Sequence, residues 1–336
     1  MLPRCPSTIL RHAKIPVLLI SDLTNIRYLT GLSVSAGLVL IRGKNMKLYV
    51  DGRYREMAKK QVKGDRCQVR EIECFERDMQ NVQQCGFESE HITVSRIGIW
   101  KRKFKNTKFV QTREVIEEFR RSKSAEELKN FRKAQRITGQ IMQKIPSFLQ
   151  KGVTEREVAE HIRRWAADLG ADELSFDAIV AFGKNSAHPH HHPGITKLQS
   201  RDIVQIDCGV RINGYCSDQS RVFFVGKPTA EQKRVYDAVQ RAKRRATEVI
   251  KGAEGAEVTN HRLDEVAREV LREEGLEQYF IHSLGHGVGL DIHEGPSLSI
   301  KAPKVVLKTN EIVTIEPGVY LPGKFGIRLE DEVVVL

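Results

Sequence analysis

The stretch DIVQIDCGVRINGYCSD (202–218) decides how the second half of this 336-residue chain folds. Its apolar run IVQI (203–206) predicts a buried strand that leads directly into Asp207. The turn-like segment RINGY (211–215) predicts a hairpin, which returns the chain beside itself and can bring Asp207 and Asp218 to one place. Two carboxylates held together repel each other unless a cation lies between them. The stretch therefore predicts a sheet that binds metal.

Helices and strands continue on both sides of this stretch. Two long amphipathic helices are predicted to begin at capping boxes, Ser124 with Glu127 and Thr154 with Glu157. Two more helices are predicted at about 229–251 and 260–275. Four further segments predict strands with their turns: SFDAIVAFG (175–183), CSDQSRVFFV (216–225), EIVTIEPGVY (311–320) and GIRLEDEVVVL (326–336). Strand runs mixed with helix runs, without strict alternation, predict an α+β domain whose sheet is covered by helices.

The first part of the chain has another pattern. Short apolar stretches recur between polar turns and helix-like segments: VLLI (17–20), GLVLI (37–41), KLYV (47–50) and IGIW (97–100). This pattern predicts a smaller α/β domain. Near residue 121 the pattern changes from short apolar stretches to long amphipathic helices. We therefore expect an N-terminal domain over residues 1–121 and a second domain over residues 122–336.

Composition narrows the class of protein. No apolar run could span a bilayer, and IPVLLI (15–20) ends too soon for a secretory signal, so we expect a soluble cytoplasmic protein. The six cysteines include no C-x-x-C pair and are predicted to be free thiols. The net charge is +12, with basic runs at 101–105 and 243–245. No nucleic-acid motif lies beside these runs, so nucleic-acid binding is not expected.

Five side chains of the second half are of the type that binds a hard metal ion. They are Asp207, Asp218, His286, Glu316 and Glu330. A mostly oxygen donor set favours manganese, iron or cobalt over a thiolate-type zinc site. Taken singly, an aspartate at a strand end is usually a turn former, and a lone histidine is more often structural. Glu316 is different, because it leaves the apolar run IVTI (312–315) before a turn, where a carboxylate needs a partner.

Six ordered motifs carry a resemblance to a known family. They are GKNSAHPH (183–190), IDCG (206–209), GYCSD (214–218), HSLGHGVGLDIHEGP (282–296), TIEPGVY (314–320) and GIRLED (326–331). Together they resemble the pita-bread metallopeptidases, in particular the aminopeptidase P and prolidase branch. NIRYLTG (25–31) and DGRY (51–54) resemble the accessory domain of that branch. The resemblance implies an α+β pita-bread catalytic domain preceded by a smaller α/β domain of the creatinase/prolidase N-terminal type.

By position, the resemblance implies two divalent metal ions, with Mn²⁺ expected first and Co²⁺, Fe²⁺ or Zn²⁺ as alternatives. Asp207 would chelate one ion, Asp218 and Glu330 would bridge both, and His286 and Glu316 would complete the second. A hydroxide held between the ions would attack the peptide carbonyl, and Glu316 would handle its proton.

Further residues match the family near this centre. His190 and His293 would stabilise the charge that develops on the carbonyl oxygen, and His282 would hold the residue on the leaving side. Arg328 would orient the metal carboxylates, with a structural ion pair as the equal alternative. His191 and His192 are expected to be exposed bystanders.

The implied activity is hydrolysis of the bond before proline, in a peptide with proline at its second position. We expect an Xaa-Pro aminopeptidase. A prolidase restricted to Xaa-Pro dipeptides stays open, because the loops that would close the site cannot be located in the sequence. Methionine aminopeptidases usually lack the accessory domain, and creatinase-like relatives lack the metal ligands. A pita-bread module that binds peptides or polyanions without catalysis is the alternative of another class, and five retained ligands disfavour it.

Two expectations concern assembly and the chain ends. Relatives are commonly dimers, so the resemblance implies a homodimer. Relatives open with a fuller helix and continue beyond the last strand, which here ends at Leu336. We therefore expect that strand to lie at an exposed sheet edge.

Overall fold

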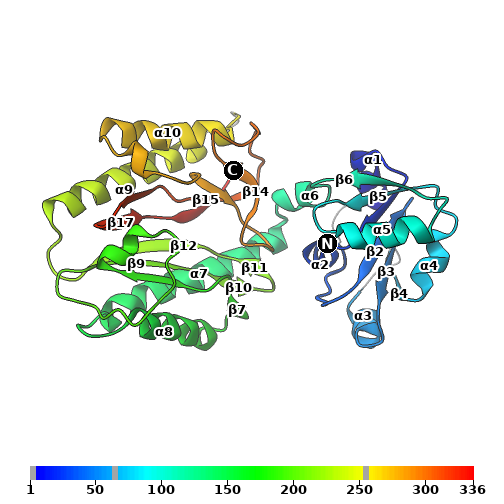
Figure 1. Cartoon of the computed structure of the whole chain (residues 1–336), viewed down its shortest axis with the longest axis horizontal. Coiled ribbons are helices and arrows are strands. Elements are labelled where there is room, and N and C mark those ends of the chain that lie inside the picture. The colour runs from blue at the N-terminus through cyan, green and yellow to red at the C-terminus, as the bar shows by residue number, and fades with distance from the viewer. Residues whose placement is uncertain (1–4, 63–66, 253–256) are drawn as a thin grey trace. The chain divides into compact units, whose positions relative to one another are not determined.

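The computed structural model describes residues 5–62, 67–252 and 257–336, and it divides into two compact units, Met1–Arg120 and Arg121–Leu336 (Figure 1). Each unit has apolar clusters of its own. In the described part of the chain, no helix combines the length and hydrophobicity needed to cross a membrane.

The first unit is built on a six-stranded sheet of order β4-β3-β2-β1-β5-β6. Its strands are β1 (Val17–Ile20), β2 (Leu38–Arg42), β3 (Asn45–Val50), β4 (Cys67–Glu71), β5 (Gln84–Glu88) and β6 (Lys108–Thr112). Leu18 and Ile20 belong to one apolar cluster, whereas Val17 and Leu19 belong to another. Successive side chains of a strand point to opposite faces, so both faces of β1 are buried and its sequence is apolar throughout.

Helices connect these strands. They are α1 (Pro6–Ala13), α2 (Leu23–Thr30), α3 (Arg55–Gln61), α4 (Cys74–Met79), α5 (Val94–Lys103) and α6 (Glu117–Arg121). The apolar stretch 97–100 lies in α5 and is helical, unlike the three earlier stretches, which are strands. The Thr93 side chain caps α5 by accepting a hydrogen bond from the Arg96 amide, and Trp100 is the buried residue of this helix. Four apolar residues alone do not distinguish a strand from a helix.

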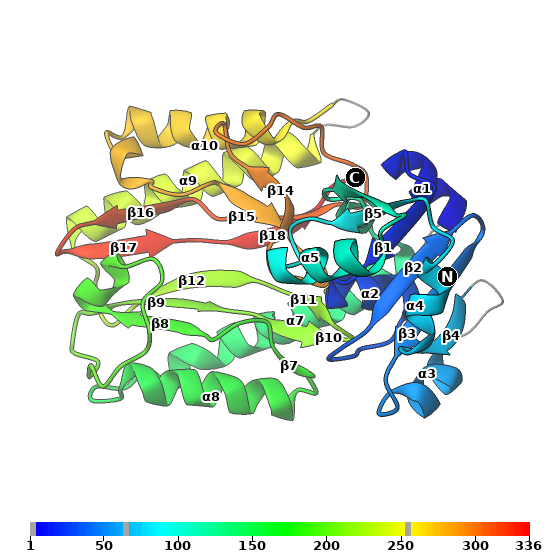
Figure 2. The same cartoon turned by 45° about the vertical axis from the view of Figure 1, so that its right-hand side comes forward.

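The second unit has four long helices, α7 (Ala125–Phe148), α8 (Glu155–Asp168), α9 (Ala230–Lys251) and α10 (Asn260–Glu273). Both predicted capping boxes are present, and a third begins α9 with Thr229 and Gln232. Short 3₁₀ turns, η1 (Gly183–Ala187) and η2 (Glu277–Tyr279), join elements of this unit. Figures 1 and 2 show α7 and α8 on one side of the strands and α9 and α10 on the other. The predicted α+β arrangement, with helices covering sheets, is confirmed.

The strands between these helices form several small sheets. They are β7 (Glu173–Leu174), β8 (Ile179–Phe182), β9 (Ile203–Cys208), β10 (Val210–Ile212), β11 (Tyr215–Cys216), β12 (Gln219–Phe224), β13 (Gly285–Gly287), β14 (Glu294–Leu298), β15 (Ile312–Ile315), β16 (Gly318–Leu321), β17 (Phe325–Arg328) and β18 (Asp331–Val334). The sheet orders are β12-β9-β8, β11-β10-β7, β14-β13-β15-β18 and β16-β17. β18 therefore lies at a sheet edge, as expected, but its central residues Glu332 and Val333 are buried, so the edge is not the exposed one that was expected.

The hairpin predicted between the two aspartates is present. β10 and β11 pair antiparallel, and their turn contains Asn213 and Gly214, which have φ angles of 49° and 83°. Positive φ at both central residues is the geometry of a type I′ turn, which Asn-Gly favours. β12 then pairs antiparallel with β9, so that Asp207 lies opposite Ser220. The register brings the end of β9 beside the start of β12. The six cysteines are free thiols, as predicted.

Candidate metal centre

The five predicted ligand side chains come from five places in the second unit. Asp207 is near the end of β9, and Asp218 immediately precedes β12. His286 is the central residue of β13, Glu316 follows β15, and Glu330 lies between β17 and β18. All five line one cavity of about 620 Å³. The structure therefore brings together residues that span more than a hundred positions of the sequence.

Three of these side chains form the tightest group. Ligand atoms of Asp218, His286 and Glu330 all lie within 4.8 Å of one another. The Nε2 atom of His286 is 3.6 Å from Asp218 Oδ2 and 3.4 Å from Glu316 Oε1. Asp207 lies outside this group of three, and its Oδ2 atom accepts a hydrogen bond of 2.5 Å from Arg328 Nη2. A site with this spacing has room for a cation among its oxygen atoms.

Buried oxygen atoms without hydrogen-bond partners test whether metal fits here. Asp207 Oδ1, Asp218 Oδ1 and Glu330 Oε1 are buried and have no partner. Buried polar atoms in proteins are almost always paired, because an unpaired one costs free energy. Three orphaned carboxylate oxygens on one cavity wall fit a bound divalent cation, which would coordinate them.

The charges of the centre give the same indication. Burial raises the pKa of Asp218 well above its usual value, and the neighbouring Glu330 raises it further. Burial is also the main cause that raises the pKa of Glu330, with Glu316 next. Burial raises the pKa of Glu316 to about 8. Without a cation these carboxylates disfavour their charged forms, so a divalent ion would relieve a repulsion that the fold itself creates.

His286 has the form that a metal ligand needs. Its Nδ1 atom is 3.0 Å from the Gly287 carbonyl oxygen, and with the proton on Nδ1 the Nε2 lone pair faces the carboxylates. Burial lowers the pKa of His286 to about 4, so the imidazole is neutral at physiological pH. The close packing of β13 against β15 beside His286 requires glycine at position 285, because a Cβ atom there would lie 2.0 Å from the Thr314 carbonyl oxygen.

Arg328 is a buried residue that donates hydrogen bonds to several groups around the centre. It is 3% exposed, and besides Asp207 it donates to Tyr320 Oη at 2.8 Å and to Ser220 Oγ at 2.9 Å. The sequence left open whether Arg328 orients the carboxylates or forms a structural ion pair. In the structure Arg328 forms an ion pair with Asp207, a predicted metal ligand, and its other hydrogen bonds surround that pair. The two alternatives therefore describe the same contact.

The three predicted site histidines line the same cavity. The ring of His293 lies 4.4 Å from that of His286, edge to face. His282 Nε2 is 3.0 Å from Tyr320 Oη, and burial, with the nearby Arg328 charge, lowers the pKa of His282 to about 4. His190 is exposed at the cavity.

One prediction in the histidine tract is wrong. His191 is not an exposed bystander, because its Nε2 atom lies 2.9 Å from Glu155 Oε2, and Glu155 is fully buried. The Glu155 carboxylate also accepts from the amides of Phe182 and Gly194. His191 therefore anchors the tract, whereas His192 is exposed and lines the cavity.

Sequence reasoning also missed Tyr320. Its hydroxyl group joins His282 to Arg328 and hence to Asp207. A signal existed, since Tyr320 lies in an apolar strand and a buried tyrosine hydroxyl needs a partner. The identity of that partner depended on the tertiary fold.

Comparisons with known proteins identify the family. The family model described as Metallopeptidase family M24 matches residues 129–336, and the Creatinase/Prolidase N-terminal domain matches residues 7–122. The Xaa-Pro dipeptidase of Pyrococcus furiosus is 35% identical over 312 residues, which cover 93% of this chain and 88% of that protein.

Two solved structures are similar over almost the whole chain. The Xaa-Pro dipeptidase from Bacillus anthracis has a TM-score of 0.92 at 33% identity, covering 98% of this chain and 93% of its own. The X-Pro aminopeptidase from Thermotoga maritima has a TM-score of 0.87 at 32% identity, with coverages of 98% and 95%. The resemblance that the six motifs carried is thereby confirmed, and the chain belongs to metallopeptidase family M24, with an N-terminal domain of the creatinase/prolidase type.

Proposed function

We propose that this protein is an Xaa-Pro aminopeptidase that depends on two divalent metal ions, Mn²⁺ before Co²⁺, Fe²⁺ or Zn²⁺. The observation that carries the proposal is the set of orphaned carboxylate oxygens of Asp207, Asp218 and Glu330 beside a neutral His286. When bound, the ions would supply an activated water and polarise the scissile carbonyl. Asp207, Asp218, His286, Glu316 and Glu330 would hold them.

The remaining groups of the cavity would act on the substrate. Glu316 would accept the proton of the activated water, because its carboxylate lies among the groups that would hold the ions, with Oε1 3.4 Å from His286 Nε2. Burial lowers the pKa of His293, so the His293 imidazole is neutral and can donate a hydrogen bond to the carbonyl oxygen as negative charge develops there. His190 shares this task from the exposed side. His282 would contact the residue on the leaving side, with its orientation set by Tyr320.

Specificity for the bond before proline rests on the relatives, which are named Xaa-Pro dipeptidase and X-Pro aminopeptidase. One feature of the cavity favours the aminopeptidase. A dipeptidase must bind a free carboxylate next to the scissile bond, and Arg or Lys usually supplies the charge. Among the described residues that line this cavity, Arg328 is the only one of these types, and its guanidinium is already bound to Asp207.

The test is hydrolysis of a matched pair, an Xaa-Pro dipeptide and an Xaa-Pro tripeptide, by metal-stripped protein before and after addition of Mn²⁺. We expect metal-dependent cleavage of both. Cleavage of the dipeptide alone would replace the proposal with a prolidase. Asp218→Ala should abolish turnover of both peptides because it removes one of the carboxylates that would hold the ions, and unaltered turnover would refute the metal centre. A folded, metal-loaded protein that cleaves neither peptide would instead favour another specificity or a binding module.

We also propose that the enzyme is a cytoplasmic homodimer. The support is the resemblance to dimeric members of its branch. Sedimentation equilibrium of the purified chain should give twice the 38.2 kDa mass of one chain, and a single-chain mass would exclude the dimer.

A further inference from the structure

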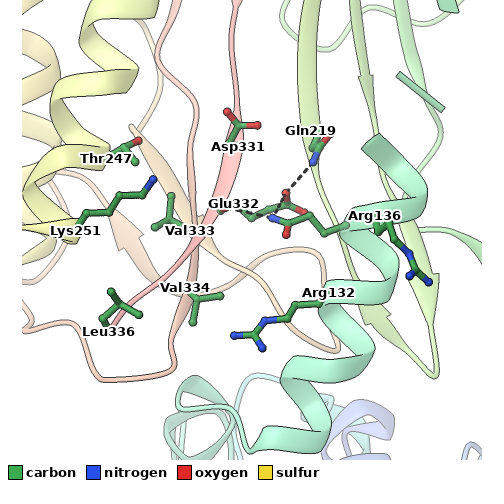
Figure 3. A pocket seen from close by; sticks show the side chains of 11 residues that line it. Arg132, Arg136, Gln219, Thr247, Lys251, Asp331, Glu332, Val333, Val334 and Leu336 are labelled. Atoms are coloured by element: carbon green, nitrogen blue, oxygen red, sulfur yellow. Dashed lines mark hydrogen bonds between the residues drawn. The ribbon is translucent and has the colours of Figure 1, made fainter. Parts of the chain in front are cut away.

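Glu332 lines a second cavity of the catalytic unit, residues 121–336, and also contacts a residue of the metal centre. That cavity, of about 650 Å³, is lined by residues of α7, α9, β12 and β18 together with Leu336, and shares no lining residue with the metal cavity (Figure 3). Glu332 is the second residue of β18 and is 6% exposed. The sequence motifs assigned no role to Glu332. Its carboxylate nevertheless reaches a predicted metal ligand.

The contact is a short buried hydrogen bond. The main-chain amide of Asp218 donates to Glu332 Oε1 at 2.6 Å. The bond joins residues 114 positions apart, so it ties the chain before β12 to the chain after Glu330.

Two glutamines fix the carboxylate that accepts this bond. Gln135 Nε2 donates to Glu332 Oε2 at 3.1 Å, and Gln219 Nε2 donates to the same atom at 3.4 Å. Gln135 belongs to α7, and Gln219 is the first residue of β12. Figure 3 shows the Gln219 amide pointing toward the Glu332 side chain. Gln135 also donates to the Glu332 carbonyl oxygen at 3.3 Å. The carboxylate is therefore held from one side and holds Asp218 from the other.

Asp218 needs such support because it lies outside any strand. Residues 217 and 218 connect β11 to β12 without strand pairing of their own. Ser217 is secured by its hydroxyl, which lies 2.8 Å from Thr138 Oγ1 and donates to the Val210 carbonyl oxygen. The amide of Asp218 is secured by Glu332. A shift of this amide would carry the Asp218 carboxylate with it, away from Glu330 and His286.

We propose that Glu332 is a positioning residue of the metal centre, which fixes the Asp218 main chain so that the Asp218 carboxylate faces Glu330 and His286. The inference rests on the proposed function in so far as Asp218 is taken to bind metal. Groups that orient metal ligands are typically worth 10- to 100-fold in metal affinity.

The test compares Mn²⁺ binding to metal-stripped full-length variants by isothermal titration calorimetry. Glu332→Ala removes the acceptor and should weaken binding of at least one ion about 10- to 100-fold. Glu332→Gln keeps a carbonyl oxygen for the Asp218 amide, and its new side-chain amide replaces Oε2. Gln219 can turn to accept from that amide through Oε1, an atom without a partner in the unsubstituted protein. Gln135 loses its bond to Oε2 and keeps its bond to the main-chain carbonyl oxygen of residue 332 in this variant. The Mn²⁺ affinity of Glu332→Gln should therefore stay within about 3-fold of that of the unsubstituted protein. This change is smaller than the roughly 10- to 100-fold loss expected when an orienting contact is removed.

A matched control separates positioning from general stability. Glu311 is 1% exposed and accepts a 2.6 Å hydrogen bond from the Lys308 amide, so it is buried like Glu332 and also accepts from a main-chain amide, away from the metal cavity. It differs in that it also forms an ion pair with Arg121. Glu311→Ala should lower the melting temperature of the metal-free protein but leave Mn²⁺ affinity unchanged. Equal weakening by Glu311→Ala and Glu332→Ala, or an unchanged affinity in Glu332→Ala, overturns the proposal.

A further variant covers the case in which Glu332→Ala does not fold. Glu332→Asp keeps the carboxyl group but withdraws its oxygen from the Asp218 amide, and should weaken Mn²⁺ binding while Glu332→Gln does not. Wild-type affinity in Glu332→Asp overturns the role of Glu332 without touching the proposed activity. Failure of the unsubstituted protein to bind Mn²⁺ would overturn the metal-dependent function itself, and the role of Glu332 with it.

Discussion

His282, Tyr320, Arg328 and Asp207 form a continuous hydrogen-bonded chain through the catalytic unit. His282 Nε2 and Tyr320 Oη are 3.0 Å apart, Tyr320 accepts from Arg328, and Arg328 donates to Asp207. The chain links His282, for which we propose a contact with the substrate, to the predicted metal ligand Asp207. Since Arg328 offers a planar fork with several donors, lysine could not reproduce all of these contacts.

His282 makes stability depend on pH in a predictable direction. Burial and the Arg328 charge lower its folded-state pKa to about 4, against about 6.5 in the unfolded chain. The unfolded state therefore binds the proton more readily between these values, and the free energy of unfolding falls as pH decreases through that window. Between pH 7 and pH 5 this group should remove about 2 kcal/mol.

The measurement is urea unfolding of the metal-free protein at pH 7 and pH 5, compared with His282→Gln. The variant lacks the titrating imidazole and should lose less stability than the unsubstituted protein by about that amount. The other buried groups titrate in both proteins, so only the difference is assigned to His282. Equal losses would contradict the neutral, buried state of this side chain.

At the scale of single residues, every side chain that the sequence motifs assigned to the site lines the metal cavity. The motifs did not predict how those side chains are held. Arg328 contacts Asp207 across 121 positions, and Glu332 contacts Asp218 across 114. Such partners follow from tertiary packing, which local patterns do not encode.

Among the elements, the β10–β11 hairpin controls the separation of Asp207 and Asp218. Its Gly214 has a φ of 83°, in the left-handed region that costs other residues about 1–2 kcal/mol. We expect Gly214→Ala to destabilise the catalytic unit by about that amount. Chemical denaturation monitored by circular dichroism would measure the change.

Gly139→Ala provides the control for this prediction. Gly139 lies within α7, and a Cβ atom there would meet nothing within 4 Å. Alanine is favoured over glycine in a helix interior by about 0.5–1 kcal/mol, so this substitution should stabilise the protein. No effect of Gly214→Ala would show that the turn does not carry the expected strain. Destabilisation by Gly139→Ala would show that an added methyl group destabilises even where φ is helical and space is free.

Elements with a strong local signal were predictable and the others were not. The capping boxes of α7 and α8 and the Asn-Gly turn of the hairpin were read from the sequence and are present. β13 and β14 were not predicted as strands. They are short, contain glycine and proline, and pair with a shift of register, so neither alternation nor β-branched residues mark them.

On the scale of the whole molecule, the two units have separate apolar cores, and only the second holds the metal ligands. We expect two transitions in differential scanning calorimetry, of which Mn²⁺ should raise only one. Binding to the folded state at 100 times the dissociation constant stabilises by about 2.7 kcal/mol, or about 5–10 °C for a unit of this size. A Mn²⁺ shift of both transitions, or one merged transition, would contradict independent units.

The five predicted ligands lie at positions 207, 218, 286, 316 and 330, and this order has a consequence for synthesis on the ribosome. A growing chain acquires its N-terminal unit, then both aspartates, then the imidazole, and Glu330 last of all. Domains generally fold in the order in which they are made. The complete donor set exists only once Glu330 has left the exit tunnel, so a nascent chain has no competent hydrolytic centre while its own unfolded segments are still exposed beside it.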